Sequence, residues 1–417
     1  MIKSGFIIAA VLFISSNLFS QTSWYRVSDS IPGMTVMSIQ FTSANTGYAS
    51  CSRNTTWPGA FLRTTNAGLN WQAVLYPDYS ADDISFLDDN TGYMICWKPG
   101  TTKVLKTTNA GIDWFTKDSI NMSGFKIKFY DYNTGFVVSK YNVVRKTTDG
   151  GNTWVTQTGV LWMEPAALCC LDANTWIVAD GGTNLNKTTN GGTNWSVTSY
   201  PVFGGGVYEM CFVNSSLGFI GTYEGKIFKS TNAGNNWTQI STIDSVYLQH
   251  NMTFVNENTG YVCGRGRYYI FRTTNGGYNW TKQAFGSNVS INYVHFLNSH
   301  TGYAGGNDGL IFKTTNGGSV FVGNISTQVP AAYSLSQNYP NPFNPSTNIK
   351  FEIPNSSDVK IIVYNLSGKE IETIVNEHLQ AGTYQAVWDA SKYSSGVYFY
   401  RIITPNFSDS RKMILVK

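Results

Sequence analysis

A seven-fold internal repeat constrains the fold of this chain more than any other feature of its sequence. Each copy has a basic residue followed by Thr/Ser-Thr-Asn/Asp-Gly/Ala-Gly, and six copies have a Trp three residues after the last Gly. The copies start at Arg63, Lys106, Lys146, Lys187, Lys229, Arg272 and Lys313, so the period is 40 to 43 residues. A period of this length is typical of a four-stranded β-propeller blade.

A second motif precedes every copy with the same period. Its seven copies are Asn45-Thr46-Gly47-Tyr48, Asn90-Thr91-Gly92-Tyr93, Asn133-Thr134-Gly135-Phe136, Asn174-Thr175-Trp176, Leu217-Gly218-Phe219, Asn258-Thr259-Gly260-Tyr261 and Thr301-Gly302-Tyr303. In the clearest repeat, residues 292–318, three short apolar runs are separated by turn sequences, and in the other repeats the Trp opens a fourth strand. The two motifs therefore predict an all-β chain with a seven-bladed propeller.

The ends of the repeat region allow two ways of closing the propeller. Trp24-Tyr25-Arg26-Val27 is similar to the strand that follows the Trp in other repeats, whereas the seventh repeat has Phe321 in place of Trp. The simplest closure adds the N-terminal strand to the last blade. In the alternative, Val320-Phe321-Val322 forms that outer strand.

The N-terminus and the charge indicate an exported protein without a nucleic-acid partner. Residues 1–20 contain Lys3, a short apolar run and then small polar residues, which predicts a secretory signal peptide. That run is too short to span a bilayer, so we expect no transmembrane segment in the mature chain. The formal charge of +4 falls to +3 without Lys3, and seven of the 29 basic residues belong to the repeat.

The six cysteines follow the repeat. Cys51 and Cys96 lie three residues after the motif Tyr, Cys263 lies two after it, and Cys169 is expected in the place of the Phe that ends other inner strands. These four positions favour buried core residues. The disulfide state of all six, which include Cys170 and Cys211, is left open. A disulfide between neighbouring blades is left open by the sequence.

Two family resemblances follow from these motifs. The segment Thr147-Thr148-Asp149-Gly150-Gly151-Asn152-Thr153-Trp154 resembles the Asp-box of sialidase-like propellers, which implies a folding element away from the ligand face. With the Asn-Thr-Gly-Tyr/Phe motif, residues 22–323 resemble YCF48-like, photosystem II assembly factor-like propellers. That resemblance implies a scaffold that holds protein partners, without chemistry of its own.

The C-terminal part contains no copy of the repeat. Its opening, Leu335-Ser336-Gln337-Asn338-Tyr339-Pro340-Asn341-Pro342-Phe343-Asn344-Pro345, and its ending, Lys412-Met413-Ile414-Leu415-Val416-Lys417, resemble the type A sorting domain of type IX (Por) secretion. The resemblance implies that residues 333–417 bind the secretion machinery, and that they are removed after outer-membrane translocation with release or surface attachment. Alternating strands predict an Ig-like sandwich, for which an adhesive or carbohydrate-binding role is the alternative.

The expected domains are a signal peptide at 1–20, the propeller at 21–325, a linker at 326–332 and the sorting domain at 333–417. In propellers, the loops that enter the inner strands and those that join the second and third strands share one face, here called the loop face. Its candidate binding residues are aromatic, a residue type suited to protein or sugar surfaces. They are Trp57, Tyr79, Trp97, Trp162, Tyr208, Tyr223 and Tyr268, and Tyr269 follows directly.

Catalytic candidates are few. Opposed carboxylates of a glycosidase would come from Asp82 or Asp83 with Glu164. The histidines show no metal-ligand spacing and no phosphate-binding loop is present, so we expect no metal and no cofactor. The sequence favours a secreted or surface-delivered, non-catalytic propeller that binds a protein or glycan. The alternative is a propeller glycoside hydrolase or lyase that acts on extracellular polysaccharide.

Overall fold

The structure is a computed structural model. It describes residues 24–53, 58–76, 78–120, 124–139, 143–158, 165–200, 206–243, 251–264, 269–284, 289–315, 317–318, 322–326, 328–390 and 393–416. The expected signal peptide lies outside these residues. The chain forms two compact units, Tyr25–Gly317 and Gly318–Lys417, which are described separately. In the segments described, no helix has the length and apolar character needed to cross a membrane.

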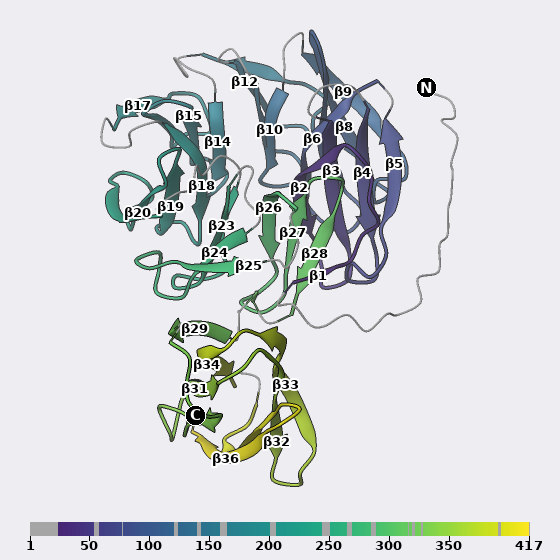
Figure 1. Ribbon diagram of the computed structural model, residues 1–417. Helices are drawn as coiled ribbons and strands as arrows, with labels where there is room; N and C mark the ends of the chain where they lie inside the picture. Colours follow the sequence, from purple (N-terminus) through teal and green to yellow (C-terminus); the bar gives the residue numbers. More distant parts are fainter. Residues whose placement is uncertain are drawn as a thin grey trace. The chain divides into compact units, whose positions relative to one another are not determined.

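The first unit consists of seven antiparallel four-stranded sheets arranged around a common centre (Figure 1), which confirms the predicted fold class. The inner strands are β2 (Met34–Phe41), β6 (Ser80–Phe86), β10 (Gly124–Phe129), β14 (Pro165–Cys170), β18 (Val207–Phe212), β22 (Asn251–Phe254) and β26 (Ile291–Phe296). The second strands are β3 (Gly47–Arg53), β7 (Gly92–Lys98), β11 (Gly135–Ser139), β15 (Trp176–Asp180), β19 (Gly218–Thr222), β23 (Gly260–Cys263) and β27 (Gly302–Gly306).

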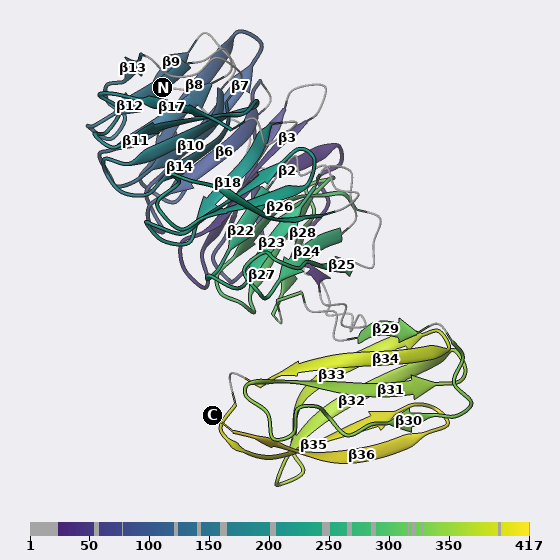
Figure 2. The ribbon, with the colours of Figure 1, turned by 90° about the vertical axis from the view of Figure 1, so that its left-hand side faces the viewer.

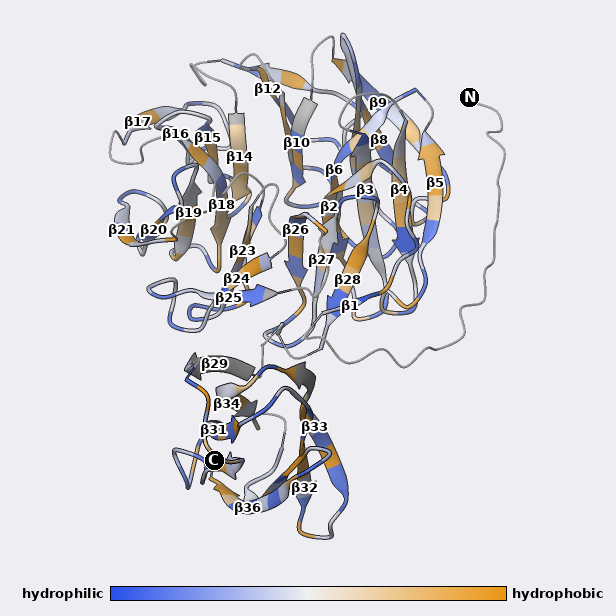
Figure 3. Cartoon of the chain, viewed as in Figure 1, coloured by the Kyte–Doolittle hydropathy of each residue, from blue (hydrophilic) through white to orange (hydrophobic). Residues whose placement is uncertain are grey.

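The two remaining strands of each blade lie farther from the centre. The third strands are β4 (Gly59–Thr64), β8 (Thr101–Thr107), β12 (Val143–Thr147), β16 (Asn184–Thr188), β20 (Lys226–Ser230), β24 (Tyr269–Thr273) and β28 (Ile311–Thr314). The outer strands are β5 (Gln72–Tyr76), β9 (Phe115–Ile120), β13 (Val155–Gln157), β17 (Ser196–Ser199), β21 (Thr238–Thr242), β25 (Thr281–Ala284) and β1 (Tyr25–Arg26). Outer strands are partly exposed, and β5, drawn as apolar in Figure 3, leaves Leu75 58% exposed.

The N-terminal strand closes the ring. β1 pairs with β28 of the last blade, with Tyr25 opposite Lys313. In the first blade Arg63 pairs with Gln72, the residue after the Trp, so Trp24 takes the register position of the Trp that the seventh repeat lacks. Ser28 extends the closure, because its hydroxyl accepts a hydrogen bond from the Ile311 N–H at 2.7 Å. Of the two closures that the sequence allowed, the first is confirmed.

The Asp-box turn has the same hydrogen bonds in successive blades. In the third blade the Thr147 hydroxyl accepts a bond from the Gly151 N–H at 2.8 Å, and the Asp149 carboxylate accepts one from the Thr153 N–H at 2.8 Å. In the first blade Asn66 accepts the equivalent bond from the Asn70 N–H at 3.0 Å. Asn can replace Asp here because the turn needs only an acceptor oxygen.

The basic residue of the repeat joins one blade to the next at four of the described junctions, through Lys106, Lys146, Lys187 and Lys313. The Lys146 ammonium donates to the Gly191 carbonyl at 2.6 Å, and the Lys313 ammonium donates to the Ala67 carbonyl at 2.8 Å. Both acceptors lie in the Asp-box turn of the following blade. These lysines therefore serve the fold, which explains part of the basic charge without a nucleic-acid partner.

Stacked aromatic rings also join the blades, and they explain the Gly of the second motif. Tyr93 of the second blade stacks on Phe129 of the third, with ring centres 3.5 Å apart. A Cβ atom on Gly135, opposite Phe129, would lie 2.7 Å from that ring. The equivalent glycines of five other blades would place a Cβ atom 2.3–2.6 Å from the nearest atom of their Phe; they are Gly47, Gly92, Gly218, Gly260 and Gly302.

The fourth blade departs from this rule and corrects one prediction. Its register pairs Cys170 with Trp176, so Cys170, and not Cys169, stands in the Phe position. The small Cys leaves room for a large residue in place of Gly, and the fully buried Trp176 fills it. The Trp176 ring lies 4.4 Å from that of Phe136 in the preceding blade.

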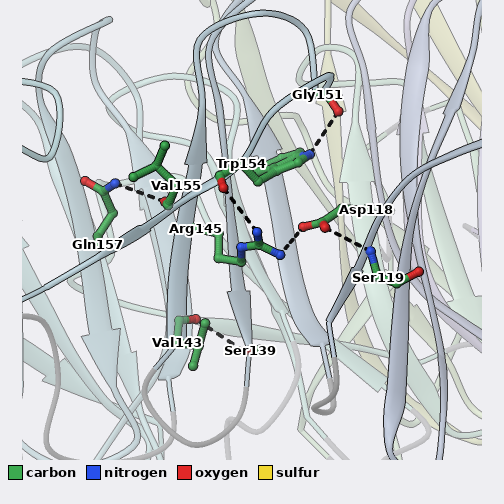
Figure 4. Close-up of polar contacts among 9 residues, drawn as sticks. All are labelled: Asp118, Ser119, Ser139, Val143, Arg145, Gly151, Trp154, Val155 and Gln157. Atoms are coloured by element: carbon green, nitrogen blue, oxygen red, sulfur yellow. Dashed lines mark hydrogen bonds and ion pairs between the residues drawn. The ribbon is translucent and has the colours of Figure 1, made fainter.

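A partly buried ion pair adds a further link between the second and third blades (Figure 4). The Arg145 guanidinium on β12 pairs with the Asp118 carboxylate on β9 and also donates to the Trp154 carbonyl at 3.1 Å. Asp118 in turn accepts a hydrogen bond from the Ser119 N–H at 2.9 Å. Arg145 therefore connects the third strand of the third blade with the outer strand of the second blade.

The second unit is a sandwich of two four-stranded sheets (Figure 2), with strand orders β29-β34-β31-β30 and β33-β32-β35-β36. Its strands are β29 (Val322–Ser326), β30 (Ser334–Leu335), β31 (Ser346–Ile353), β32 (Ser357–Asn365), β33 (Glu370–Leu379), β34 (Gly382–Asp389), β35 (Gly396–Ile403) and β36 (Ser408–Leu415). The expected propeller boundary at 325 is wrong, because β29 pairs with β34 and completes the edge of a sandwich sheet.

Candidate functional site

The inner strands direct two rings of side chains toward the propeller axis. One ring, three residues before the end of each inner strand, comprises Ser38, Asp83, Lys126, Ala167, Glu209, Asn251 and Tyr293. The other, one residue before the end, comprises Gln40, Ser85, Lys128, Cys169, Cys211, Thr253 and His295. We call these the axial rings.

Many axial side chains bond to the free backbone edge of the next inner strand. The Gln40 amide both accepts from the Phe86 N–H and donates to the Phe86 carbonyl, each at 2.8 Å. His295 accepts from the Phe41 N–H at 3.2 Å, across the junction of the last and first blades. An edge strand has unpaired backbone groups, so polar axial residues are needed for folding.

The axial rings also contain charged groups that lie close enough to influence one another. Burial opposes the charged form of Lys126, but Glu209 and Asp83 outweigh this effect and raise its pKa. Burial raises the pKa of Glu209 to about 7, despite attraction by Lys126. Burial, assisted by Lys128, lowers the pKa of His295 to about 4, so His295 is neutral at pH 7, as its acceptor role requires. Lys128 is exposed, and the axis is therefore accessible to solvent.

The predicted catalytic carboxylates have different structural roles. Asp83 is buried in an axial ring, and its carboxylate accepts a hydrogen bond from the Ile127 N–H of the next blade at 3.0 Å. Asp82 is the extra residue of a β-bulge between Ala81 and Asp83, and it accepts a bond from the Ser80 hydroxyl at 2.7 Å. Glu164 lies outside the described residues, as do Trp57, Trp162 and Tyr268.

The bulge recurs and decides which loop-face residues point toward the axis. Six inner strands show the register shift at this position, which inserts one residue and reverses the side-chain alternation. Tyr208 occupies it in the fifth blade. Its ring centre lies 5.6 Å from that of Tyr223, so the structure brings these two predicted residues together.

Tyr79 and Trp97, by contrast, are separated. Cys96 pairs with Ala81 and Lys103, and these residues are on the side of the second blade that packs against Tyr48 of the first. Tyr79, two residues before Ala81, packs on the same side. Trp97 follows Cys96 and so faces the opposite side of the sheet.

The lysines beside these aromatic residues were missed by the sequence reasoning. Lys98 and Lys103 place their ammonium nitrogens 4.7 and 4.6 Å from the centre of the Tyr79 ring. In the sixth blade the Lys282 ammonium lies 3.8 Å from the Tyr269 ring centre. The signal that could have found them is strand pairing, because Lys98 and Lys103 flank a short turn after the candidate Trp97.

Redox and metal chemistry have little support among the residues that the structure describes. All six cysteines are free thiols. Burial raises the pKa of Cys51 to about 12, which leaves it without thiolate character at neutral pH. No group of three His, Cys, Asp or Glu residues in the described ranges is arranged to hold a metal ion.

Family models match both units. The model described as "Photosynthesis system II assembly factor YCF48" matches residues 117–244. The model described as "Secretion system C-terminal sorting domain" matches residues 337–417. The chain thus combines a YCF48-like domain with a sorting tail for export, which takes the protein to the cell surface or beyond through the secretion machinery. No match was found among curated proteins.

Solved structures of several propellers are similar to the chain. A structure titled "YCF48 bound to D1 peptide" is 16% identical, with a TM-score of 0.58, and covers 73% of this chain and all of its own. YCF48 from Cyanidioschyzon merolae is 16% identical, with a TM-score of 0.55, and covers 70% of this chain and 98% of its own.

A GH74 enzyme from Niastella koreensis is also similar, at 15% identity and a TM-score of 0.57, covering 80% of this chain and 59% of the enzyme. At such identities these structures support the fold alone.

Proposed function

We propose that this protein is an exported, non-catalytic propeller that holds a peptide segment of a partner protein on its loop face. The sorting domain delivers the propeller, and the expected signal peptide at 1–20 starts the export. After translocation, the sorting domain is removed and the propeller is released or attached to the surface. The propeller then acts as a rigid support for its loops.

The observation that carries this proposal is that the described candidate carboxylates, Asp82 and Asp83, accept hydrogen bonds from other groups of the propeller. Asp83 uses its carboxylate to hold the backbone of the next blade, and Asp82 accepts a hydrogen bond from its neighbour Ser80. A glycosidase needs two carboxyl groups that face the substrate about 5 to 9.5 Å apart. A role as structural acceptor does not favour that chemistry.

Two further observations support a peptide partner. The loop face carries tyrosines in contact, Tyr208 with Tyr223, and Tyr is enriched in protein interfaces. YCF48, to which residues 117–244 are similar, has a solved structure with a bound D1 peptide. We transfer the mode of binding, a peptide on a propeller, and no particular partner.

The test uses the mature chain in parallel screens against solubilised cell-envelope proteins and a glycan array. Every bound protein is cross-linked and its contacts are mapped, and every bound glycan is assayed for reducing-sugar release. We expect a protein partner cross-linked through the loop face and no sugar release. Sugar release that is lost in Asp82→Asn, Asp83→Asn or Glu164→Gln would replace the proposal with a hydrolase. Glycan binding without release would replace the peptide with a glycan.

A further inference from the structure

The loop-face end of the second blade holds two lysines around one tyrosine. Tyr79 precedes β6, Lys98 ends β7 and Lys103 lies on β8, so three different segments supply the group. Both ammonium nitrogens lie within 4.7 Å of the centre of the Tyr79 ring. The Tyr79 backbone is fixed as well, because its carbonyl accepts a hydrogen bond from the Gly59 N–H of the first blade at 2.7 Å.

The two lysines of this group differ from other lysines of the propeller in their partners. Lys226 on the fifth blade forms an ion pair with Glu224 at 2.8 Å, and the repeat lysines donate to backbone carbonyls. Within the described ranges, no carboxylate lies at ion-pair distance from Lys98 or Lys103. Two like charges beside one ring repel each other, and an anion between them would remove that repulsion.

We propose that Lys98 and Lys103, with the Tyr79 hydroxyl between them, bind the carboxylate of an acidic side chain in the partner peptide. Each ammonium would donate a charge-assisted hydrogen bond to the carboxylate, and the phenol would donate a third. The inference rests on the proposed function, since it assigns the chemistry of one contact in the peptide that the loop face holds.

The electrostatics of Tyr79 agree with this geometry. Slight burial would raise the pKa of the phenol, but the two neighbouring ammonium groups, Lys103 and Lys98, outweigh it and lower the pKa. The site thus has a positive potential even with the phenol between the lysines. Tyr79 also packs against the apolar cluster between the first and second blades, which holds its ring in place before a ligand binds.

An acidic polysaccharide could also present carboxylates, but the described residues at this site favour a peptide. Trp97, the residue best suited to stack on a sugar ring, faces the other side of the blade. Among the described residues the site therefore offers cations around the Tyr79 ring, and Trp97 does not add a second aromatic platform that could hold a pyranose. A carboxylate on a flexible side chain needs no such platform.

The test measures binding of a labelled oligoglutamate to the mature chain by fluorescence anisotropy, with oligoglutamine as the neutral probe and polygalacturonate as the glycan probe. We expect oligoglutamate to bind more tightly than oligoglutamine, and binding to weaken as salt is added. The variants Lys98→Gln and Lys103→Gln should each weaken oligoglutamate binding by at least about tenfold. Tyr79→Phe should weaken it less, because both ammonium groups remain.

Lys282→Gln is the matched control. Lys282 also lies over a tyrosine ring, that of Tyr269, but one lysine and not a pair lies there. Equal binding of the two peptides, or equal weakening by the control variant, would overturn the inference. So would polygalacturonate binding that depends on Lys98 and Lys103 when oligoglutamate binding does not. A screened protein partner whose binding is unchanged in Lys98→Gln and Lys103→Gln would overturn this inference but leave the proposed function intact.

Discussion

In the fourth blade Cys170 and Trp176 stand where other blades have Phe and Gly. We therefore predict that mutations of these two residues compensate each other. Elsewhere an inner-strand Phe covers a Gly, whereas here Cys170 lies opposite Trp176. The variant Cys170→Phe introduces a ring into space that Trp176 already fills, and such overpacking costs about 2 kcal/mol. The variant Trp176→Gly empties a fully buried site and adds a Gly to a strand, at a cost of about 4 kcal/mol.

The double variant restores the combination found in the other blades. If the two changes were independent they would cost about 6 kcal/mol together, but the new Phe should occupy the volume vacated by the Trp. We therefore expect the double variant to be more stable than Trp176→Gly alone, with a coupling energy of about 3 kcal/mol. Stacking of the new ring on Phe136 would reproduce the contact seen between Tyr93 and Phe129.

Differential scanning calorimetry of the mature chain measures this coupling through the propeller transition. For a unit of this size, a loss of 1 kcal/mol lowers Tm by about 2 °C, so Trp176→Gly should lower it by about 8 °C. With a coupling energy of about 3 kcal/mol, the double variant should lower Tm by about 6 °C, and not by the roughly 12 °C expected of independent changes. A double variant whose Tm falls by the sum of the single effects would refute the packing explanation for Cys170 and Trp176.

Three further predictions follow from the closure, the axis and the turns. Removal of Trp24–Ser28 should open the ring and make the last blade sensitive to limited proteolysis, because β28 loses its outer partner; an unchanged digestion pattern would argue against closure by β1. Asp83→Ala should destabilise the propeller by about 1–3 kcal/mol in denaturant unfolding, because the buried Ile127 N–H loses its acceptor, whereas Asp83→Asn keeps an acceptor and should cost less. Hydrogen bonds from Thr153 lower the pKa of Asp149 to about 2, below its value in the unfolded chain. The contribution of these hydrogen bonds to the stability of the propeller is present above pH 4 and is lost as pH falls toward 2. The variant Asp149→Asn should therefore match the wild-type Tm at pH 7, and its Tm should fall less than that of the wild type in acid.

The pKa of Glu209 gives a prediction of opposite sign. Its folded value of about 7 lies above its ordinary value of 4.5, so the folded state binds the proton more tightly. The stability that this provides is complete below pH 4.5 and is lost as pH rises through 7. Glu209→Gln should therefore flatten the decline of Tm between pH 4.5 and 8. A variant with the same pH profile as wild type would show that Glu209 does not titrate in this range.

The repeat made much of the fold predictable from the sequence, since each blade confirms the same turn and strand positions. The number of blades and the closure by Tyr25–Arg26 were predicted on that basis. The face of the sheet toward which each side chain points was not predictable, because one inserted residue reverses the direction of the side chains next to it. The bulge at Asp82 thus separates the directions of Asp82 and Asp83. The error at Cys169 has another origin, because the four-residue spacing from Phe41 to Asn45 points to Cys170 before Asn174.

The candidate site was harder to predict, because its members come from different strands. Tyr79 was identified as an aromatic residue of the loop face, but Lys98 and Lys103 meet it only through the pairing of β6, β7 and β8. The two lysines were ordinary charged residues in the sequence. Only the register shows that Lys103 shares the Tyr79 side of the blade and that Trp97 does not.

Polar residues on a propeller axis are weak evidence for catalysis by themselves. Each inner strand presents an unpaired backbone edge, and Gln40, Asp83 and His295 satisfy that edge in the next blade. Function should be sought in the polar groups that remain after the edges are satisfied. On the described part of the axis these include Lys128, which is exposed, and the Glu209 carboxylate oxygen Oε2, which has no hydrogen-bond partner there. The same reasoning applied to the loop face selects Lys98 and Lys103, which form no ion pair with a described residue.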